Sequence, residues 1–387
     1  MVGKQVVPVQ CANNPLEYFE FFFDDDLLKI IVIETNRYVE QFHKWVPTTP
    51  NEIRVYLGLL MLMGIIQKPS LRMYFSRKHI LETPFFPNVM SEERFALLNK
   101  FLHFVDNSDK EIAKRDPKLY KILPISEHWK NNFQKVYILG KEVSVDESSL
   151  LWKGRLLWKQ YNPMKASRFG IKMFELFGSG TKLGCEITKD TDLFSTKVVL
   201  SLSEKLLDSG RCIYLDNYYS SPDLFQRLVQ RTTDAVGTVK ITRKGIPTVL
   251  KKKLKKEEVD SIKCGKLVTL KWTDKHDVSM LTTRHSIEMQ PVSRKGGLEL
   301  VNKPICVIDY NKYMGGVDLK DQLLESFLLK KRTKVWYRKL FNHLVNTAVL
   351  NAYILFHKEG NKEDHLSFRI VLVNKIIASY HIQKLEK

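Results

Sequence analysis

Residues 212–223 read C-I-Y-L-D-N-Y-Y-S-S-P-D, and this stretch determines what kind of fold the chain can adopt. Its first four residues are apolar, β-branched or aromatic and predict a buried strand. Ser221-Pro222-Asp223 then supplies an N-cap, a proline at the first helical position and an acidic first turn, which predict the start of a helix. Asp216 therefore comes at the carboxyl end of a strand that we expect to be central, where functional groups of α/β proteins gather.

Two further strands are predicted upstream of this one. Residues 142–152 (E-V-S-V-D-E-S-S-L-L-W) and 169–177 (F-G-I-K-M-F-E-L-F) are rich in β-branched and aromatic residues, and a helix candidate follows at 195–207. Because successive side chains of a strand point to opposite faces, we expect only one of Asp146 and Glu147 to join a given site. Strands interleaved with helices predict an α/β core.

Helices are predicted on both sides of this core. Residues 49–52 (T-P-N-E) form a capping box ahead of the apolar run 55–66, and residues 91–93 (S-E-E) start another helix. Residues 334–356 predict one long amphipathic helix. Residues 245–302 depart from the α/β pattern, because a lysine run there precedes a strand pair at 266–273 and 277–283.

The charge of the chain favours a polyanionic partner. Its 62 basic and 43 acidic residues give a net charge of +19 over 387 residues, which favours nucleic acid over a merely basic or ribosome-associated protein. The longest apolar run, 55–66, is too short for a bilayer span of about 20 residues, so no membrane partner is expected. The N-terminus has no long apolar segment typical of a secretory signal, which favours an intracellular location.

Cysteine spacing argues against a structural zinc site. The five cysteines stand alone in the sequence, without a C-x-x-C pair or a histidine at zinc-ligand spacing. We therefore expect reduced thiols and no zinc.

A further pair of acidic residues lies in residues 313–324 (Y-M-G-G-V-D-L-K-D-Q-L-L). Asp318 and Asp321 are three residues apart, so both can lie on one helix face and reach one metal ion. Carboxylates suit magnesium, and two such ions about 3.5–4 Å apart can activate an attacking hydroxyl and stabilise a leaving oxygen. Taken singly, each aspartate is more often a cap, a turn former or a solvated charge.

Several segments together resemble the piggyBac transposase family. They are V-S-V-D-E-S (143–148) with W-K-G-R (152–155) and Q-Y-N-P-M-K (160–165), Y-L-D-N-Y-Y-S-S-P (214–222), V-G-T-V-K-x-x-R-K-G-I-P (236–247) and D-Y-N-K-Y-M-G-G-V-D-L-K-D-Q-L (309–323). Their order matches as well, and upstream segments such as P-L-E-Y-F-E-F-F-F-D (15–24) extend the resemblance over about residues 15–357.

The resemblance implies a ribonuclease-H-like mixed-sheet catalytic core, interrupted by a small β-containing insertion domain and flanked by helical dimerisation and DNA-binding segments. By motif, Asp146, Asp216 and Asp318 match the family's essential aspartate triad, and Asp321 matches a fourth acidic residue near the metals. The implied cofactor is a pair of Mg²⁺ ions, for which Mn²⁺ could substitute. The implied partners are double-stranded DNA, as transposon ends and TTAA targets, and a second copy of the chain; the implied location is the nucleus.

Pattern and resemblance together predict the following division of the chain. An N-terminal tail at 1–14 precedes a helical dimerisation and DNA-binding region at 15–135, the first part of the catalytic core at 136–244 and the insertion domain at 245–302. The last core helix, with the third aspartate, is predicted at 303–322, and the second part of the helical region at 323–387.

Basic residues predicted to contact DNA phosphates fall into three groups: Lys153, Arg155 and Lys159 after the first aspartate; Lys240, Arg243, Lys244, Lys251, Lys252 and Lys253 leading into the insertion; and Lys331, Arg332 and Lys334 before the long helix. Such contacts give affinity that falls steeply with salt and carries little sequence information. The alternative for the lysine run is a solvated loop or a nuclear-import signal.

Three functions stay open from the sequence. The leading one is a Mg²⁺-dependent cut-and-paste DNA transposase that cleaves and joins strands through hairpin intermediates at TTAA sites. The alternatives are a domesticated DNA-binding protein without transposition activity and a structure-specific nuclease without strand transfer. The intact aspartates favour activity. The sequence up to Lys387 contains no cysteine-rich zinc module of the kind that family members usually carry, so we do not expect these residues alone to recognise transposon ends.

Overall fold

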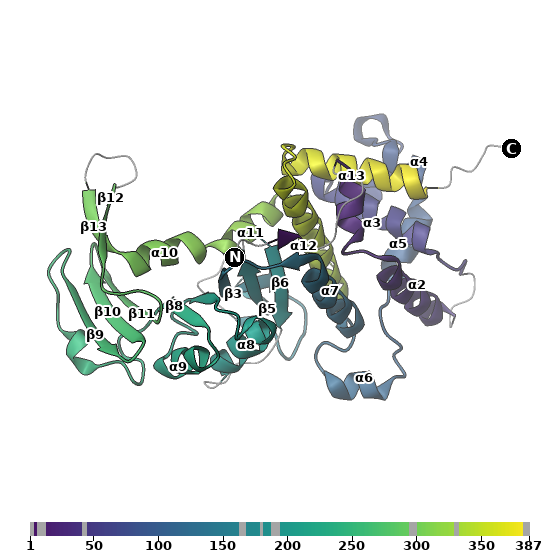
Figure 1. Ribbon diagram of the computed structural model, residues 1–387. Coiled ribbons are helices and arrows are strands. Elements are labelled where there is room, and N and C mark those ends of the chain that lie inside the picture. The colour runs from purple at the N-terminus through teal and green to yellow at the C-terminus, as the bar shows by residue number, and fades with distance from the viewer. Residues whose placement is uncertain are drawn as a thin grey trace. The chain divides into compact units, whose positions relative to one another are not determined.

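The computed structural model describes residues 4–5, 13–40, 45–161, 168–178, 181–186, 194–293, 300–328 and 333–381. The chain divides into two compact units, and Figure 1 labels most of their elements. The sheet unit comprises Met1–Lys4, Ile138–Ser149 and Ile171–Lys320, and the helical unit comprises Gln5–Tyr137, Leu150–Gly170 and Asp321–Lys387. This is the mixed α/β fold with helical flanks that the sequence predicts.

A mixed sheet of nine strands is formed by the described residues. Its order is β4-β5-β3-β7-β8-β11-β10-β9, and β6 pairs with β5. The strands are β3 (Glu142–Leu151), β4 (Gln160–Tyr161), β5 (Phe169–Gly178), β6 (Thr181–Glu186), β7 (Cys212–Leu215), β8 (Asp234–Thr238), β9 (Val259–Cys264), β10 (Leu267–Thr273) and β11 (Asp277–Thr282).

The centre of the sheet is parallel. Strand β7 pairs in parallel with β3 on one side and with β8 on the other, and every residue of β7 is buried. Parallel neighbours require crossover connections, which α8 (Phe194–Ser203) and α9 (Pro222–Gln230) supply. The predicted cap of α9 is confirmed, because the Ser221 side chain accepts a hydrogen bond from the Leu224 N–H.

The strands of residues 245–302 extend this sheet. Strand β11 pairs antiparallel with β8, and β10 pairs antiparallel with both β11 and β9, which confirms the predicted strand pair. Pairing with β11 satisfies the backbone groups that β8 would otherwise present at an open edge. A separate two-stranded ribbon joins β12 (Met289–Ser293) to β13 (Leu300–Pro304).

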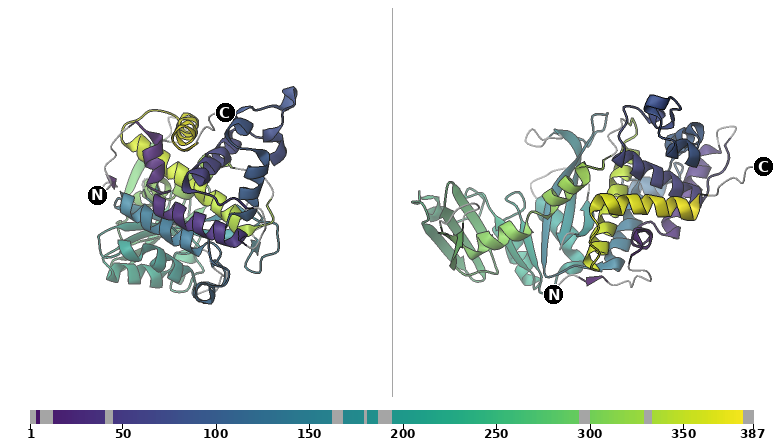
Figure 2. Two further views of the ribbon diagram at one scale, coloured as in Figure 1. Left: turned by 90° about the vertical axis from the view of Figure 1, so that its right-hand side faces the viewer. Right: turned by 90° about the horizontal axis from the view of Figure 1, so that it is seen from above.

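One hydrophobic cluster joins the inserted strands to the parallel ones. It combines Tyr214 of β7 and Val236 of β8 with Leu270 of β10 and Met280 of β11. Helix α10 (Ile305–Tyr313) contributes Val307 to this cluster and lies against β8, β11 and β13 (Figures 1 and 2). The chain thus leaves the inserted strands along the helix that leads into the next acidic segment, α11 (Gly316–Glu325).

The helical unit is built from segments at both ends of the sequence. Its helices are α1 (Pro15–Glu20), α2 (Asp25–Val39), α3 (Pro50–Ile65), α4 (Phe85–Val89), α5 (Glu92–Phe101), α6 (Lys110–Arg115), α7 (Leu123–Val136), α12 (Trp336–Lys358) and α13 (His365–Tyr380). Short 3₁₀ turns lie at Leu71–Phe75 and His79–Leu81 in this unit, and at Glu204–Leu206 and Thr248–Lys251 in the sheet unit. Strand β1 (Lys4–Gln5) pairs with β2 (Tyr137–Ile138).

Local signals for these helices agree with their observed limits. The Thr49 and Ser91 side chains accept hydrogen bonds from the N–H groups of Glu52 and Arg94, as expected for N-caps. The apolar run 55–66 lies almost wholly within α3, which is buried over most of its length and packs against α13. Among the described residues, none of the helices combines the length and apolar character that a membrane span requires.

A buried arginine lies between α12 and α13. The Nε of Arg369 donates to Nε2 of His365 at 3.0 Å, and its Nη1 donates to Oδ1 of Asn346 at 3.0 Å. Its guanidinium also lies 4.5 Å from the centroid of the Phe327 ring. Burial and the charge of Arg369 lower the pKa of His365 to about 3, so the imidazole stays neutral and accepts the hydrogen bond.

This arrangement predicts a loss of stability in mild acid. The unfolded histidine titrates near its ordinary pKa of 6.5, whereas the folded one does not until about pH 3. The stability contributed by neutral His365 is therefore complete above about pH 6.5 and falls by about 1.4 kcal/mol per pH unit below it. Urea unfolding at pH 7 and pH 5 measures this. His365→Gln, which can still accept from Arg369, should lose this part of the pH dependence, and an unchanged dependence would contradict the assignment.

Candidate active site

Asp146 and Asp216 lie side by side because of the register of β3 and β7. In this parallel pair Val145 is opposite Leu215, and each aspartate is the next residue, at the point where the ladder ends. Strand β7 ends there while β3 continues to Leu151, so the two carboxylates meet at the carboxyl end of β7. Oxygen atoms of Asp146, Asp216 and Glu147 lie within 4.8 Å of one another, and all three residues are half-buried.

The participation of Glu147 corrects the expectation that only one of Asp146 and Glu147 could join the site. The strict alternation of side chains holds for a regular ladder, and the pairing with β7 stops at Val145. The Tyr219 hydroxyl, in the turn after β7, donates to Oε2 of Glu147 at 3.0 Å and holds the longer glutamate side chain toward the aspartates. In the sequence, the only signal for this was an acidic residue directly after Asp146.

The environment of Asp216 concentrates negative charge. Its Oδ1 accepts hydrogen bonds from the N–H groups of Tyr218 at 2.9 Å and Tyr219 at 3.4 Å, which fix the carboxylate in the turn. Burial and the neighbouring charge of Glu147 nevertheless raise the pKa of Asp216. Burial and Glu147 also raise the pKa of Tyr219, which keeps its hydroxyl protonated as a donor. A cation would relieve the repulsion among these three carboxylates.

The donor set fits a hard divalent ion. All three side chains offer carboxylate oxygens, the ligands that Mg²⁺ and Mn²⁺ prefer, and histidine and cysteine are absent from the cluster as far as the described residues show. The cluster has the composition of a magnesium site rather than a zinc site.

Asp318 and Asp321 lie outside this cluster. Asp318 is exposed in the first turn of α11, and Asp321 is half-buried one turn further along. Within the described part of the chain, the group of mutually close carboxylates consists of Asp146, Glu147 and Asp216. The structure therefore brings together two members of the predicted triad, and the metal-binding roles of Asp318 and Asp321 stay predictions.

Arg243, which the sequence predicts to contact phosphate, binds the turn that carries Asp216. Its Nη2 donates to the carbonyl oxygen of Asn217 at 2.5 Å and to that of Tyr218 at 3.1 Å. Because these carbonyls directly follow Asp216, the guanidinium helps to hold the backbone of the acidic turn. The sequence contained the arginine but no signal for this contact.

The other residues of the sheet unit that the sequence predicts to contact phosphate are solvent-exposed. Lys240, Lys244, Lys251, Lys252 and Lys253 are all exposed. Lys252 already pairs with Asp260, with Nζ 3.0 Å from the carboxylate. The rest of this lysine run is therefore better placed to receive a phosphate.

In the helical unit, Lys153, Arg155 and Lys334 are exposed. Lys159 is half-buried, and its Nζ donates to the Gly154 carbonyl at 3.2 Å. The predicted contacts Lys331 and Arg332 lie outside the described residues.

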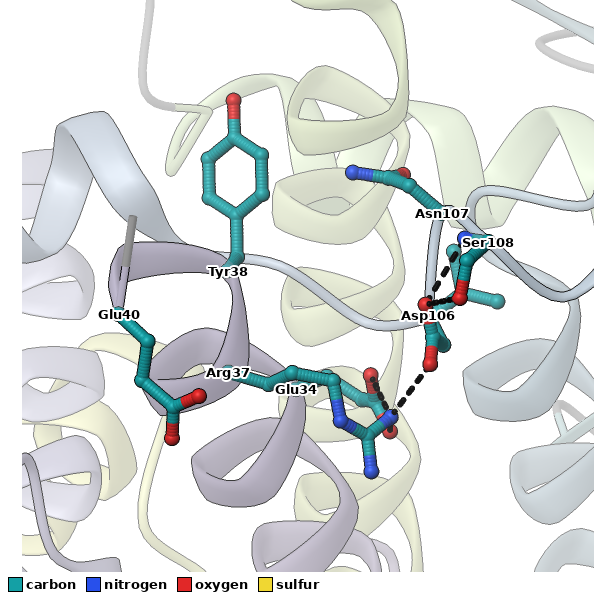
Figure 3. A pocket seen from close by; sticks show the side chains of 8 residues that line it. Glu34, Arg37, Tyr38, Glu40, Asp106, Asn107 and Ser108 are labelled. Carbon is teal, nitrogen blue, oxygen red and sulfur yellow. Dashed lines mark hydrogen bonds and ion pairs between the residues drawn. The ribbon is translucent and has the colours of Figure 1, made fainter. Parts of the chain in front are cut away.

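A pocket of about 480 Å³ in the helical unit has a different chemistry (Figure 3). Glu34, Arg37, Tyr38, Glu40 and residues 105–108 line it. Arg37 bridges Glu34 at 2.8 Å and Asp106 at 3.4 Å, so its charge is balanced within the pocket wall. None of the three clustered carboxylates lines this pocket, and we assign it no catalytic role.

The order of the strands, with carboxylates where the pairing of β3 and β7 ends, defines a protein of the ribonuclease-H-like fold class. The family described as Transposase IS4 matches residues 14–353, and the chain belongs to this family. The resemblance to piggyBac transposases that the sequence motifs indicate is confirmed.

Known proteins similar to the chain agree with this assignment. It is 28% identical over 382 residues to human PiggyBac transposable element-derived protein 2 and 26% identical over 388 residues to human PiggyBac transposable element-derived protein 3. Each alignment covers 92% of this chain and 64% of the relative, so the chain spans less than two thirds of the length of these relatives.

A solved structure shares the fold. The chain matches the cryo-EM structure of a piggyBac transposase synaptic complex with hairpin DNA, with a TM-score of 0.88 and 24% identity. This match covers 99% of the chain and 84% of the solved one.

Proposed function

We propose that the chain is the core of a Mg²⁺-dependent DNA transposase that cleaves and joins DNA strands. The observation that carries this proposal is the convergence of Asp146, Glu147 and Asp216 where the parallel pairing of β3 and β7 ends. Membership of a transposase family and a net charge of +19 support DNA as the substrate.

In this proposal, Asp146, Glu147 and Asp216 hold divalent cations, and Asp318 and Asp321 complete the set as the motifs imply. When bound, Mg²⁺ or Mn²⁺ supplies positive charge to the scissile phosphate and makes a hydroxyl more acidic. Other residues of the chain position these carboxylates. Tyr219 orients Glu147, while Arg243 and two backbone N–H groups hold Asp216 in its turn.

We further propose that cleavage proceeds through hairpin intermediates at TTAA sites, in a homodimer located in the nucleus. The resemblance of the motifs to the piggyBac family supports these steps, and so does the shared fold with a transposase captured in complex with hairpin DNA. The alternative is a domesticated DNA-binding protein without transposition activity. The retained carboxylate cluster favours the enzyme, because a protein that only binds DNA has no need to crowd three carboxylates.

Purified protein incubated with Mg²⁺ and a TTAA-flanked DNA end tests the proposal. Hairpin products would support a transposase, whereas simple nicks would indicate a nuclease without strand transfer. Stable binding without any cleavage would indicate the domesticated DNA-binding protein and would overturn the proposed activity. EDTA should suppress every product.

The exposed lysines predict a salt-dependent contribution to DNA binding. Lys251→Ala and Lys253→Ala should each weaken binding to all DNA sequences alike. Each should reduce the slope of log Kobs against log salt by about 0.9 if one phosphate contact is lost. Lys252→Ala is the matched control and should change the slope less, because Asp260 already neutralises Lys252. Fluorescence anisotropy at several salt concentrations measures the slopes, and unchanged slopes would exclude this lysine run as a phosphate contact.

A further inference from the structure

A buried ion pair in the sheet unit takes no part in the carboxylate cluster. The Nζ of Lys320, on α11, lies 2.5 Å from Oε2 of Glu175, on β5, and the two side chains are 1% and 0% exposed. The Ser148 hydroxyl, on β3, donates to the other oxygen of Glu175 at 2.6 Å. Three elements therefore meet at one carboxylate whose two oxygens are both engaged.

Stability alone is a weak reason for such a pair. Removing two charges from water carries a large desolvation cost, and replacing a buried ion pair by apolar residues of similar size is often neutral or stabilising. A buried ion pair can instead favour one packing arrangement of the elements that carry it. In any other arrangement one buried charge would lack its partner, which is strongly destabilising. The pair thus selects one way of packing α11 on β5.

A second contact makes this packing specific. A Cβ added to Gly316 would lie 3.1 Å from the ring of Phe177, so the first turn of α11 approaches β5 closely there. Residues 316 and 320 are one helical turn apart, and their partners Phe177 and Glu175 both lie on β5. The helix therefore contacts the strand at two successive points, which fixes its rotation about its own axis.

The ion pair also lies close in sequence to the predicted metal ligands. Ser148 follows Asp146 by two residues on β3, and Lys320 follows Asp318 by two residues on α11. Asp318 lies between the two contact points of α11 and is exposed, whereas Val317 and Lys320 are buried. Fixing the rotation of α11 therefore fixes the direction in which Asp318 extends from the helix.

We infer that Glu175 and Lys320 are positioning residues, which set the rotation of α11 and thereby direct the carboxylate of Asp318. Neither side chain is expected to touch DNA or metal, since both are buried. The consequence for catalysis rests on the proposed function, whereas the consequence for α11 does not.

The test replaces the pair by apolar residues of similar size. Glu175→Leu/Lys320→Met should keep the melting temperature and the affinity for DNA, because the core stays filled and the basic surface is unchanged. Its rate constant for Mg²⁺-dependent cleavage should fall about 100-fold, as expected when a reacting group is misplaced by about 1 Å. Amide hydrogen exchange in residues 316–325 should become about 10-fold faster.

The matched control is an exposed ion pair of the same unit. Asp223 and Arg227 pair on α9 with 65% and 56% exposed side chains, and Asp223→Leu/Arg227→Met should leave exchange of α11 and cleavage unchanged. Should the buried double variant fail to fold, Ser148→Ala removes one hydrogen bond and must still accelerate exchange in α11. Wild-type cleavage and exchange in the folded variant would overturn the inference. Inactive wild-type protein would overturn the proposed function, and exchange would then decide the inference alone.

Discussion

Asp216→Asn is expected to reduce Mg²⁺-dependent DNA cleavage by at least about 10³-fold, the loss of several kcal/mol of charge stabilisation. The side-chain oxygen of asparagine can still accept the hydrogen bonds from Tyr218 and Tyr219, so the turn should persist. What disappears is the negative charge that a divalent cation needs at the junction of β3 and β7. Single-turnover cleavage of a labelled DNA end with Mg²⁺ measures the effect.

The same substitution should stabilise the fold in EDTA. Asp216 is crowded by Asp146 and Glu147, and its removal relieves repulsion that no metal then compensates. Thermal unfolding in EDTA should show a higher melting temperature for Asp216→Asn than for the wild type. Asp223→Asn, which removes an exposed carboxylate from α9, is the control for a general charge effect. Cleavage by Asp216→Asn at the wild-type rate would remove Asp216 from the active site.

Gly237→Ala is expected to destabilise the sheet unit by about 3 kcal/mol, a cost typical of forcing an added group into a packed interior. Gly237 of β8 lies opposite Leu215 of β7 in the parallel ladder. A Cβ at this position would lie 2.6 Å from the Leu215 carbonyl oxygen and closer still to the Ser220 hydroxyl. The carbonyl belongs to the backbone and has little freedom to move away.

This substitution should also impair cleavage, because Leu215 and Ser220 enclose the turn of Asp216. The Ser220 hydroxyl donates to the Asp216 carbonyl at 2.8 Å, and displacement of Ser220 would shift the carboxylate. Urea unfolding gives the free-energy change. Gly315→Ala is the matched control, since a Cβ there would meet nothing within 4 Å and should be tolerated. Equal stability of the two alanine variants would refute the packing argument.

Much of the fold follows from local sequence. The caps at Thr49, Ser91 and Ser221, the buried strand before Asp216 and the strand pair that became β10 and β11 depend on residues close together in the chain. The predicted long helix exists but begins at Trp336 rather than Lys334. Short-range hydrogen bonding and periodicity determine such features, so they can be predicted without knowledge of the partners.

The motifs also identified Asp146 and Asp216, which the sheet then brought together. The alternation rule wrongly excluded Glu147, because the end of the ladder and the distant Tyr219 hydroxyl decide where that side chain lies. Arg243 was assigned to phosphate by its charge alone, whereas its contacts with the turn after Asp216 depend on how the chain folds back.

The sequence by itself determined the family, the α/β character of the core and the position of Asp216 at a strand end. Only the tertiary structure decided that Glu147 joins the two aspartates and that Lys320 pairs with Glu175 across 145 residues of chain. The physical reason is that a charge in the interior of low polarity must pair with a charge that lies near it in space. The distance between two residues along the sequence does not predict whether they are near in space.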